Sequence, residues 1–577
     1  MSREELKRRD RVSIGEFIFY RLHELGIRHI LGVPGDFNLQ LLDHIYKVPG
    51  LQWVGACNEL NAAYAADGYA RTVGIGAFVT TFGVGELSAI NGVAGAYSEQ
   101  IPIIHIVGTT SRMMQKAHVM IHHTLGENWD HTTYQRMSEP VRSASAFLTD
   151  ETTAAAEIDR VLETAVKTRL PVYLFVPVDV SDIIIDASPL VKLLNVEVHN
   201  IGREADEDRV VLEIIELIEK ATNPGIIVDM LVQRHGLVED TKSLISLIDA
   251  PVYVTPLSKS FIDESDVNFA GLYCGVMSSS PEVRACAEGH DFMLHLGPFP
   301  TSSNTGGFSN NIPTEKSVKL HPGYCSIGNK SWESLHFRPV VEKLVLHFSQ
   351  HPCQRKAKSS LPLPKTINNL EIDQSNDPLD HARFWARMNM YLQPGDCVIA
   401  EVGTAQFGSL EFKLPNEVQY FSQFYFGSIG FTVPALLGAL LARKSLGLSG
   451  RAILLIGDGS LQLTVQEIGT IIREGFTPTI IVVNNAGYTI ERFIHGPEQQ
   501  YNDISTLWDH QKILSFFGAP KSRSYTARTY AELSKVLLNE DFQKSDCIQL
   551  LEVFFEKMDL PRKLLSLGEL AREREAR

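Results

Sequence analysis

Two short motifs toward the C-terminus carry the residue types that hold a divalent metal and a diphosphate. Gly-Asp-Gly-Ser occupies residues 457–460, and Asn-Asn-Ala-Gly occupies residues 484–487. Asp458 and the side chain of Asn485 offer hard oxygen ligands, and the Gly487 carbonyl offers a third. Mg²⁺ prefers oxygen ligands and usually completes its octahedron with substrate phosphates and water. The two motifs therefore predict a magnesium site next to a bound diphosphate.

The segments around these motifs predict how they would meet. Residues 452–456 and 479–483 are short apolar runs that predict buried strands, and residues 463–472 between them have helical periodicity. Both candidate ligands then follow parallel strands, at the edge where open α/β sheets bind ligands. Gly459 lets the backbone come close, and the Ser460 hydroxyl can bond a phosphate oxygen. Gly-Asp-Gly alone is a common turn, so the prediction depends on the whole strand–helix–strand combination.

Other side chains capable of acid–base chemistry lie mainly in the first quarter of the chain. Asp36 follows a predicted strand on a turn into a helix, Glu59 begins an alanine-rich helix, and His122-His123 stand in a polar, loop-like stretch. Each also has a structural interpretation. Asp36 could cap its helix, Glu59 suits a helix dipole, and Glu491 could be an ordinary exposed glutamate. Adjacent histidines also arise by chance in a chain that has 19 of them.

Composition narrows the class of protein. The chain has 577 residues, which suggests about three or four domains, and 44% hydrophobic residues make a large core feasible. The formal net charge of −15 disfavours nucleic acid and anionic membranes as main partners. Seven scattered cysteines form no Cys-x-x-Cys pair, and the N-terminus leads into no apolar signal core. These features predict a cytoplasmic protein from a reducing compartment.

Three segments repeat the pattern of buried strand, glycine turn and amphipathic helix. They predict an α/β protein with three doubly wound parallel-sheet domains at 1–185, 200–353 and 379–577. The stretch between 185 and 200 is expected to cross the surface, and the polar, proline-containing residues 354–378 predict a linker. The strands predicted in the first two segments are 28–33, 79–82, 103–107, 171–176, 226–228, 251–254 and 292–296.

One glycine-rich turn partly matches the sequence motif, or fingerprint, of dinucleotide-binding sites. Gly83-Val84-Gly85-Glu86 follows a predicted strand and precedes a helix. Ser88 stands where the fingerprint needs its third glycine, and no acidic ribose partner follows about 20 residues later. We therefore interpret the segment as a tight strand-to-helix turn and not as a nicotinamide site.

Four motifs in order give the chain a family resemblance. They are Gly-Asp-Phe-Asn at 35–38, Asn-Glu-Leu-Asn-Ala-Ala and its continuation at 58–71, His-His-Thr-Leu-Gly at 122–126, and Gly-Tyr-Thr-Ile-Glu at 487–491. With these motifs the chain resembles the fungal-type pyruvate decarboxylases, within the thiamine-diphosphate-dependent 2-oxo-acid decarboxylases. The resemblance covers nearly the whole length.

The resemblance implies a role for each candidate acid and base. Glu59 would hydrogen-bond the aminopyrimidine ring of thiamine diphosphate and favour the imino tautomer that deprotonates the thiazolium carbon. Asp36, His122, His123 and Glu491 would surround the reacting carbons, with Asp36, His123 and Glu491 also binding the substrate. Proton donors of this kind contribute on the order of 10²–10⁴ in rate.

The resemblance also implies how the cofactor is held. The three candidate ligands would bind Mg²⁺, with Gly459, Ser460 and Thr404 on the diphosphate side. Gly427 and Ile429 would hold the cofactor bent, with Ile429 wedged between its two rings. The remaining implied cofactor contacts are Ser428, Asn485, Ala486, Gly487, Tyr488, Thr489 and Ile490.

The implied reaction is non-oxidative decarboxylation of a 2-oxo acid, most simply pyruvate to acetaldehyde and carbon dioxide through an ylide and an enamine. The thiazolium serves as the electron sink that a carbanion from a 2-oxo acid needs. The family builds its site between domains of two subunits, so the resemblance implies a homodimer or homotetramer. Carboligation and a catalytically silent scaffold are the alternatives from other classes, although all the expected acids and metal ligands are present.

Three positions depart from the family pattern. Pyruvate enzymes commonly have Phe where this chain has Ser303, and Trp where it has Phe426. A pocket distinguishes each methylene by about 1–3 kcal/mol, so these changes could admit aromatic or branched 2-oxo acids. Phe424 or Phe299 could instead refill the space. Residues 229–235 lack the cysteine of substrate-activated members, so activation through that thiol is not expected.

Overall fold

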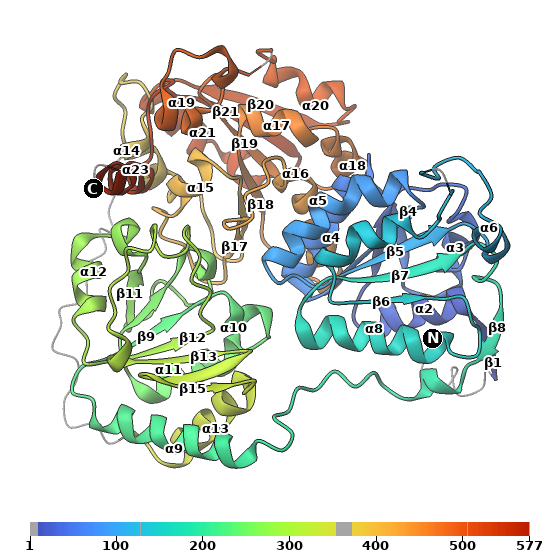
Figure 1. Cartoon of the computed structure of the whole chain (residues 1–577). Helices are drawn as coiled ribbons and strands as arrows, with labels where there is room; N and C mark the ends of the chain where they lie inside the picture. Colours follow the sequence, from blue (N-terminus) through green and yellow to red (C-terminus); the bar gives the residue numbers. More distant parts are fainter. Residues whose placement is uncertain (1–9, 127, 354–371, 505, 576–577) are drawn as a thin grey trace. The chain divides into compact units, whose positions relative to one another are not determined.

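The structure is a computed structural model that describes residues 10–126, 128–353, 372–504 and 506–575. The chain divides into two compact units. The first contains Met1–Glu197, Ser428–Ser449 and Leu463–Phe476, and the second contains Val198–Gly427, Gly450–Gln462 and Thr477–Arg577. One large parallel sheet lies in the first unit, and two large sheets lie in the second (Figure 1). The predicted fold class, α/β with three sheets built mainly from parallel strands, is confirmed.

The sheet of the first unit has six parallel strands in the order β3-β2-β4-β5-β7-β6. Its strands are β2 His29–Gly32, β3 Gln52–Gly55, β4 Gly76–Thr81, β5 Ile103–Thr109, β6 Ala144–Phe147 and β7 Val172–Pro177. Every residue of β4, β5 and β7 is buried, as expected for parallel strands covered on both faces. The strand predicted from residue 79 begins at Gly76, because pairing with β5 extends it through Gly76, Ala77 and Phe78.

The helices of the first unit are α2 Ile14–Glu24, α3 Leu39–Asp43, α4 Glu59–Val73, α5 Val84–Ser98, α6 Arg112–Lys116, α7 Thr133–Ser138, α8 Ala154–Thr168, α16 Thr432–Leu446 and α18 Glu467–Arg473. α4 begins after Asn58, whose side chain accepts a bond from the Asn61 amide at 2.8 Å. It ends at Gly74, which has φ of 101°. A small antiparallel ribbon pairs β1 (Arg11–Ser13) with β8 (Ile184–Asp186).

The small residues of α4 are explained by its packing against α16. A Cβ added at Gly68 would lie 2.2 Å from the Ala435 carbonyl oxygen, and one at Gly438 would lie 1.8 Å from the Ala65 carbonyl oxygen. Only glycine lets two backbones approach so closely. The helix that carries Glu59 in its first turn is thereby fixed against a helix more than 350 residues later in the chain.

The central sheet, in the second unit, has seven strands in the order β11-β10-β9-β12-β13-β14-β15. They are β9 Pro224–Val228, β10 Val252–Val254, β11 Phe269–Leu272, β12 Phe292–Leu296, β13 Ser317–His321, β14 Tyr324–Ile327 and β15 Lys330–Glu333. The first five strands in this order are parallel, but β14 and β15 are antiparallel to their neighbours. The prediction of a parallel sheet is thus wrong at this edge, where short turns join successive strands and leave no room for a crossover helix.

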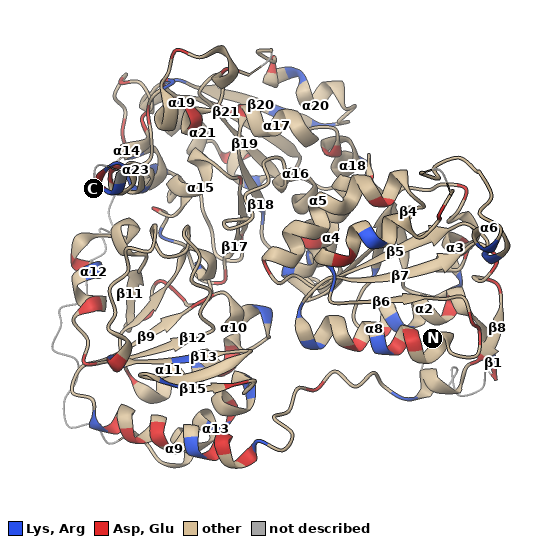
Figure 2. Cartoon of the chain, viewed as in Figure 1, with Lys and Arg blue, Asp and Glu red and all other residues tan. Residues whose placement is uncertain are grey.

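Amphipathic helices accompany the central sheet. The helices of this part are α9 Glu204–Lys220, α10 Leu231–Arg234, α11 Val238–Ile248, α12 Pro281–Glu288 and α13 Phe337–Gln350. In α9, Val210, Ile214 and Ile218 repeat every fourth residue and are fully buried. Acidic residues dominate the rest of α9, as the red segments of this helix show (Figure 2).

The third sheet has six parallel strands in the order β17-β16-β18-β19-β21-β20. They are β16 Cys397–Ala400, β17 Gln419–Phe421, β18 Ala452–Gly457, β19 Thr479–Asn484, β20 Ser522–Ala527 and β21 Ile548–Phe554. β18 and β19 are neighbours, so the two motif halves that follow them end at the same sheet edge, as the sequence predicts. The other helices are α14 His381–Met388, α15 Thr404–Ser409, α17 Asp458–Thr464, α19 Thr489–His495, α20 Ile513–Phe516, α21 Tyr530–Leu537, α22 Glu540–Lys544 and α23 Arg562–Glu575.

The helix predicted over 463–472 is two helices. α17 starts directly at Asp458, and α18 follows after a break at residues 465–466. At the break the Thr464 hydroxyl donates to the Gly430 carbonyl oxygen at 2.6 Å. Adjacent β-branched residues and a side chain bonded elsewhere both disfavour a continuous helix.

Residues 354–371 of the predicted linker lie outside the described residues. The end of that linker joins the second unit, since Pro378 forms a bridge with Thr529 and the Leu379 amide bonds the Arg528 carbonyl at 3.0 Å. Among the helices that the structure describes, none is long and apolar enough to cross a membrane.

Candidate active site

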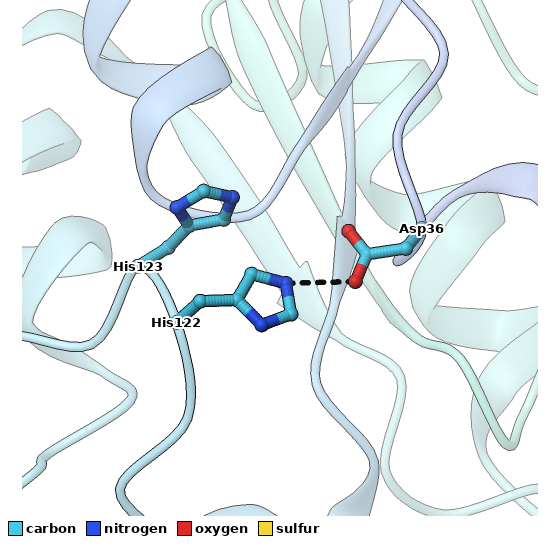
Figure 3. Close-up of side chains that lie close together, drawn as sticks. All are labelled: Asp36, His122 and His123. Carbon is cyan, nitrogen blue, oxygen red and sulfur yellow. Dashed lines mark hydrogen bonds and ion pairs between the residues drawn. The ribbon is translucent and has the colours of Figure 1, made fainter.

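Asp36, His122 and His123 form one cluster in the first unit (Figure 3). Asp36 lies on the turn between β2 and α3, and the histidines lie in the loop between α6 and α7. The His122 Nε2 and Asp36 Oδ2 atoms are 2.7 Å apart, and one polar atom of each residue lies within 4.8 Å of the others. The side chains of His122 and Asp36 are 51% and 55% exposed. Residues 86 positions apart are therefore brought together at an accessible surface.

The two histidines are fixed by their neighbours. The Phe37 ring stacks on His122 with centroids 5.1 Å apart. His123 has φ of 72°, and its carbonyl oxygen accepts a hydrogen bond from the Tyr134 hydroxyl. Tyr134 is buried and its ring meets Phe82 edge to face at 5.2 Å. The backbone of His123 is thus held in a conformation that non-glycine residues adopt only with support from their surroundings.

Glu59 lies in the first turn of α4 and is half-buried. Its Oε1 atom lies 3.0 Å from the position of a Cβ added at Gly85, so the carboxyl group packs against the first turn of α5. The start of α4 is held by Glu467, a fully buried residue of α18. Glu467 Oε2 accepts from the Asn61 side chain at 2.7 Å and from the Cys57 amide at 3.2 Å. No sequence spacing pointed to Glu467.

Asp458 and Asn485 follow neighbouring strands of the third sheet and are both buried. Asp458 Oδ1 accepts from the Gly459 amide at 2.9 Å. Asp458 Oδ2 and Asn485 Oδ1 have no hydrogen-bond partner among the described residues. Burial raises the pKa of Asp458 to about 6, and a bound cation would favour its charged form. Two buried oxygens without partners on adjacent strands fit the ligand set of Mg²⁺.

The first asparagine of the Asn-Asn pair has a different role. The Asn484 side chain donates to Glu552 Oε1 at 2.7 Å. Glu552 in turn lies 2.8 Å from Nδ1 of His510, a buried residue that the sequence did not single out. These bonds occupy the Asn484 side chain, so of the two asparagines Asn485 is the one whose side-chain oxygen could bind a metal.

A buried arginine holds the turn that contains Asn485 and Gly487. Ala486 and Gly487 have φ of 56° and 139°. Arg492 Nη1 donates to the Asn485 carbonyl oxygen at 3.0 Å, and Nη2 donates to the Ala486 carbonyl oxygen at 2.7 Å. Nη2 also pairs with Asp503 at 2.6 Å. Arg492 was not predicted from the sequence, because its bonds within the turn go to backbone carbonyl oxygens. Every residue has such a group, so residue types do not indicate these bonds.

The other predicted cofactor residues are distributed as follows. Thr404 is buried at the start of α15, after Gly403 with φ of 111°, and Gly427 has φ of 69°. Ser428 belongs to the first unit, where its hydroxyl lies 2.6 Å from that of Tyr64. Gly459 and Ser460 are buried in the first turn of α17, Tyr488 and Ile490 are half-buried, and Thr489 is buried. Half-buried Ile429 lies in the first unit, and Glu491 is exposed in the first turn of α19.

The two aromatic positions that depart from the family pattern lie in loops of the second unit, and residues 229–235 contain α10 of the same unit. Ser303 and Phe426 are half-buried. Phe424 is buried in the core cluster of the central domain, and its ring packs on Phe407 at 5.5 Å. Phe299 meets the exposed Tyr425 edge to face at 5.5 Å. Phe424 is therefore part of the core, which leaves Phe299 as the other candidate for refilling the space.

Comparison with known proteins shows the family to which the chain belongs. Residues 12–134, 211–341 and 401–546 match the N-terminal TPP binding, central, and C-terminal TPP binding domains of thiamine pyrophosphate enzymes. A Schizosaccharomyces pombe relative is 44% identical over 97% of this chain and 98% of its own length. Pyruvate decarboxylase of Kluyveromyces lactis and pyruvate decarboxylase isozyme 2 of Saccharomyces cerevisiae are each 41% identical over the same shares.

A solved structure has the same fold. The thiamine diphosphate-dependent 4-hydroxybenzoylformate decarboxylase of Rhodococcus jostii RHA1 superposes with a TM-score of 0.72 at 20% identity, over 94% of this chain and 99% of that one. The chain therefore belongs to the thiamine pyrophosphate enzymes, and within that class to the pyruvate decarboxylase family. The family resemblance seen in the four sequence motifs is confirmed.

Proposed function

We propose that this protein decarboxylates pyruvate to acetaldehyde and carbon dioxide without oxidation, using thiamine diphosphate and Mg²⁺. Membership of the family supports the reaction class. The observation that carries the cofactor assignment is a pair of buried oxygens, from Asp458 and Asn485, that follow adjacent parallel strands and find no hydrogen-bond partner among the residues that the structure describes. When bound, thiamine diphosphate supplies the electron sink for the carbanion that decarboxylation leaves.

In this proposal the second unit holds the charged end of the cofactor. Asp458 Oδ2, Asn485 Oδ1 and the Gly487 carbonyl bind Mg²⁺, and Ser460 and Thr404 face the diphosphate. The buried site excludes competing water, which strengthens charge interactions within it. The implied contacts of Gly427, Ile429 and residues 486–490 remain part of the proposal.

The first unit would supply all of the proposed proton donors except Glu491, which lies in the second unit. Glu59 would be the group that hydrogen-bonds the aminopyrimidine ring of the cofactor and holds the proton to be exchanged there. Asp36 accepts a hydrogen bond from His122 and so orients its ring, and His122 and His123 hold protons beside the reacting carbons with Glu491. The substrate carboxylate and carbonyl would lie among Asp36, His123 and Glu491. Each positioned proton donor is worth on the order of 10²–10⁴ in rate.

The assembly and location are further parts of the proposal. We infer a homodimer or homotetramer with the site at a subunit interface, supported by the family resemblance. We also propose three domains at 1–185, 200–353 and 379–577, and the three large sheets and the three matched family regions support this division. Seven free cysteines suit a cytoplasmic, reducing environment.

The experiment is a panel of 2-oxo acids assayed on purified protein with added thiamine diphosphate and Mg²⁺. We expect the highest kcat/KM for pyruvate and acetaldehyde as the product. An acyloin as the main product would indicate a carboligase instead. Calorimetry that detects no uptake of thiamine diphosphate in the presence of Mg²⁺ would contradict the whole proposal.

A second candidate function is decarboxylation of bulkier 2-oxo acids, and the small Ser303 and the half-buried Phe426 favour it. A large preference for phenylpyruvate over pyruvate would support this candidate and overturn the first. The substitutions Ser303→Phe and Phe426→Trp restore the bulk and should then shift the preference, measured as the ratio of kcat/KM values, back toward pyruvate. The expected change in the free energy that separates the two substrates is about 1–3 kcal/mol for each methylene excluded.

A further inference from the structure

The glycine turn before α5 is held by a carboxyl group that has no role in the proposed chemistry. Glu86 lies in the first turn of α5 and is 5% exposed. Its Oε1 atom accepts from the Gly83 amide at 2.9 Å. Its Oε2 atom has no hydrogen-bond partner among the described residues. Burying a carboxyl group without a full set of hydrogen bonds lowers the stability of the fold. A residue of this kind is expected to have a functional or structural role.

The turn that Glu86 holds lies directly against two candidate catalytic side chains. Gly83 has φ of 71°, and a Cβ added to it would lie 3.1 Å from both Cβ and the carbonyl oxygen of His123. A Cβ added at Gly85 would lie 3.0 Å from Glu59 Oε1. Residues 81–85, which join β4 to α5, therefore contact Glu59 on one side and His123 on the other.

The turn also reaches the third member of the cluster. A Cβ added at Gly35, the residue before Asp36, would lie 2.6 Å from the Thr81 side chain at the start of the turn. Tyr134, which bonds the His123 carbonyl oxygen, lies 3.0 Å from a Cβ added at Gly83. A shift of the turn by a fraction of an ångström would displace these contacts together, because interiors are close-packed.

We propose that Glu86 is a positioning residue for the decarboxylation: by holding the Gly83 amide it sets the turn at 81–85, and through the turn it sets the spacing of Glu59, His123 and Asp36. This inference rests on the proposed function. Glu86 touches none of the reacting groups and acts only through the turn.

The surroundings of Glu86 agree with a role in precise placement. The titratable groups that face it are Arg142 at the end of a short 3₁₀ segment, Tyr134 of α7 and Tyr173 of β7. The Tyr173 hydroxyl is buried, and no hydrogen-bond partner for it lies within the described part of the chain. Burial raises the pKa of Glu86 to about 7, and the Gly83 amide and Arg142 oppose that rise. The hydrogen bond to Gly83 is thus made in a water-poor setting, where it holds the backbone firmly.

The test compares Glu86→Leu, Glu86→Asp and Glu86→Gln in the holoenzyme with saturating pyruvate, thiamine diphosphate and Mg²⁺. Leucine removes the acceptor, and aspartate keeps the charge but is too short to reach Gly83. Both should lower kcat about 10- to 100-fold, the effect of misplacing groups by about 1 Å. Glutamine keeps an acceptor for the Gly83 amide, so it should restore kcat to within about threefold of wild type.

Glu16 provides the matched control. It occupies the same position in the first turn of α2, where its carboxylate accepts from the Ser13 amide at 3.3 Å. Glu16→Leu should lower the unfolding temperature without lowering kcat. If Glu86→Leu does not fold, Glu86→Asp and Glu86→Gln decide the question.

A folded Glu86→Asp or Glu86→Leu variant with kcat within twofold of wild type would overturn the inference, and so would a Glu86→Gln variant as slow as Glu86→Leu. Failure of the proposed function itself is separate, because it would appear as an inactive wild type in the same assay.

Discussion

At the scale of single residues, Glu59 is the group on which the proposed chemistry depends most. Glu59→Gln keeps the shape of the side chain but removes its exchangeable acid proton, so kcat should fall by about 10²–10⁴. The fold should be unaffected, because Asn58 and Glu467 hold the start of α4 and Glu59 does not. Steady-state kinetics and thermal unfolding of the variant check both statements, and normal turnover would count heavily against the mechanism.

The raised pKa of Glu86 makes a separate prediction about stability. Its pKa is about 7 in the folded protein against 4.5 for an ordinary glutamate. The folded state therefore binds this proton more tightly than the unfolded state, so its contribution to stability is present below pH 4.5 and is lost as pH rises through about 7.

Glu86→Gln should remove that loss. Relative to wild type, the variant should gain up to about 3 kcal/mol of stability as the pH is raised from about 5 to 8. Unfolding in urea at the two pH values measures the difference. If the difference in unfolding free energy between Glu86→Gln and wild type is the same at both pH values, Glu86 is already ionised at the lower pH.

At the scale of elements, the turn proposed to bind the metal is held by Arg492 of α19. The guanidinium bonds two carbonyl oxygens of a turn whose residues have positive φ, and Asp503 completes the arrangement. Outer contacts of this kind are typically worth 10- to 100-fold in metal affinity. Arg492→Met should therefore weaken the Mg²⁺-dependent binding of thiamine diphosphate by about 10- to 100-fold.

Calorimetric titration of the cofactor in the presence of Mg²⁺ measures this effect without relying on activity. Arg523→Met is the matched control, since Arg523 pairs with Asp546 away from the turn. Equal cofactor affinity in the Arg492 variant and the control would show that the turn keeps its shape without the guanidinium.

At the scale of the whole molecule, the proposed interface site can be tested by mixing subunits. Glu59→Gln and Asp458→Ala should each be nearly inactive alone. If Glu59 of one subunit serves the metal motif of another, a mixed dimer carries one site with both changes and one with neither. Refolding the two variants together should then restore roughly a quarter of wild-type activity by random pairing. A mixture no more active than its parts would contradict a site shared between subunits.

Local pattern was enough for much of the fold. The strands after which Asp458 and Asn485 lie are continuous apolar runs, and burial of a parallel strand on both faces requires such runs. The antiparallel edge of the central sheet and the early start of β4 were not predictable, because strand pairing decides both. The break between α17 and α18 depends on a bond from Thr464 to a carbonyl 34 residues away.

The sequence by itself predicted a site for a metal and a diphosphate from residue types and spacing, and the reaction class followed from the resemblance of its ordered motifs to a known family. Only the tertiary structure showed that Asn484 bonds Glu552, whereas the side-chain oxygen of Asn485 has no partner among the described residues. It alone also showed that Arg492, Glu467 and Glu86 hold the backbone near the candidate site residues. The physical reason is that these side chains act through hydrogen bonds to backbone groups or to residues far along the chain. Every residue has backbone groups, so such partners are invisible until the chain is folded.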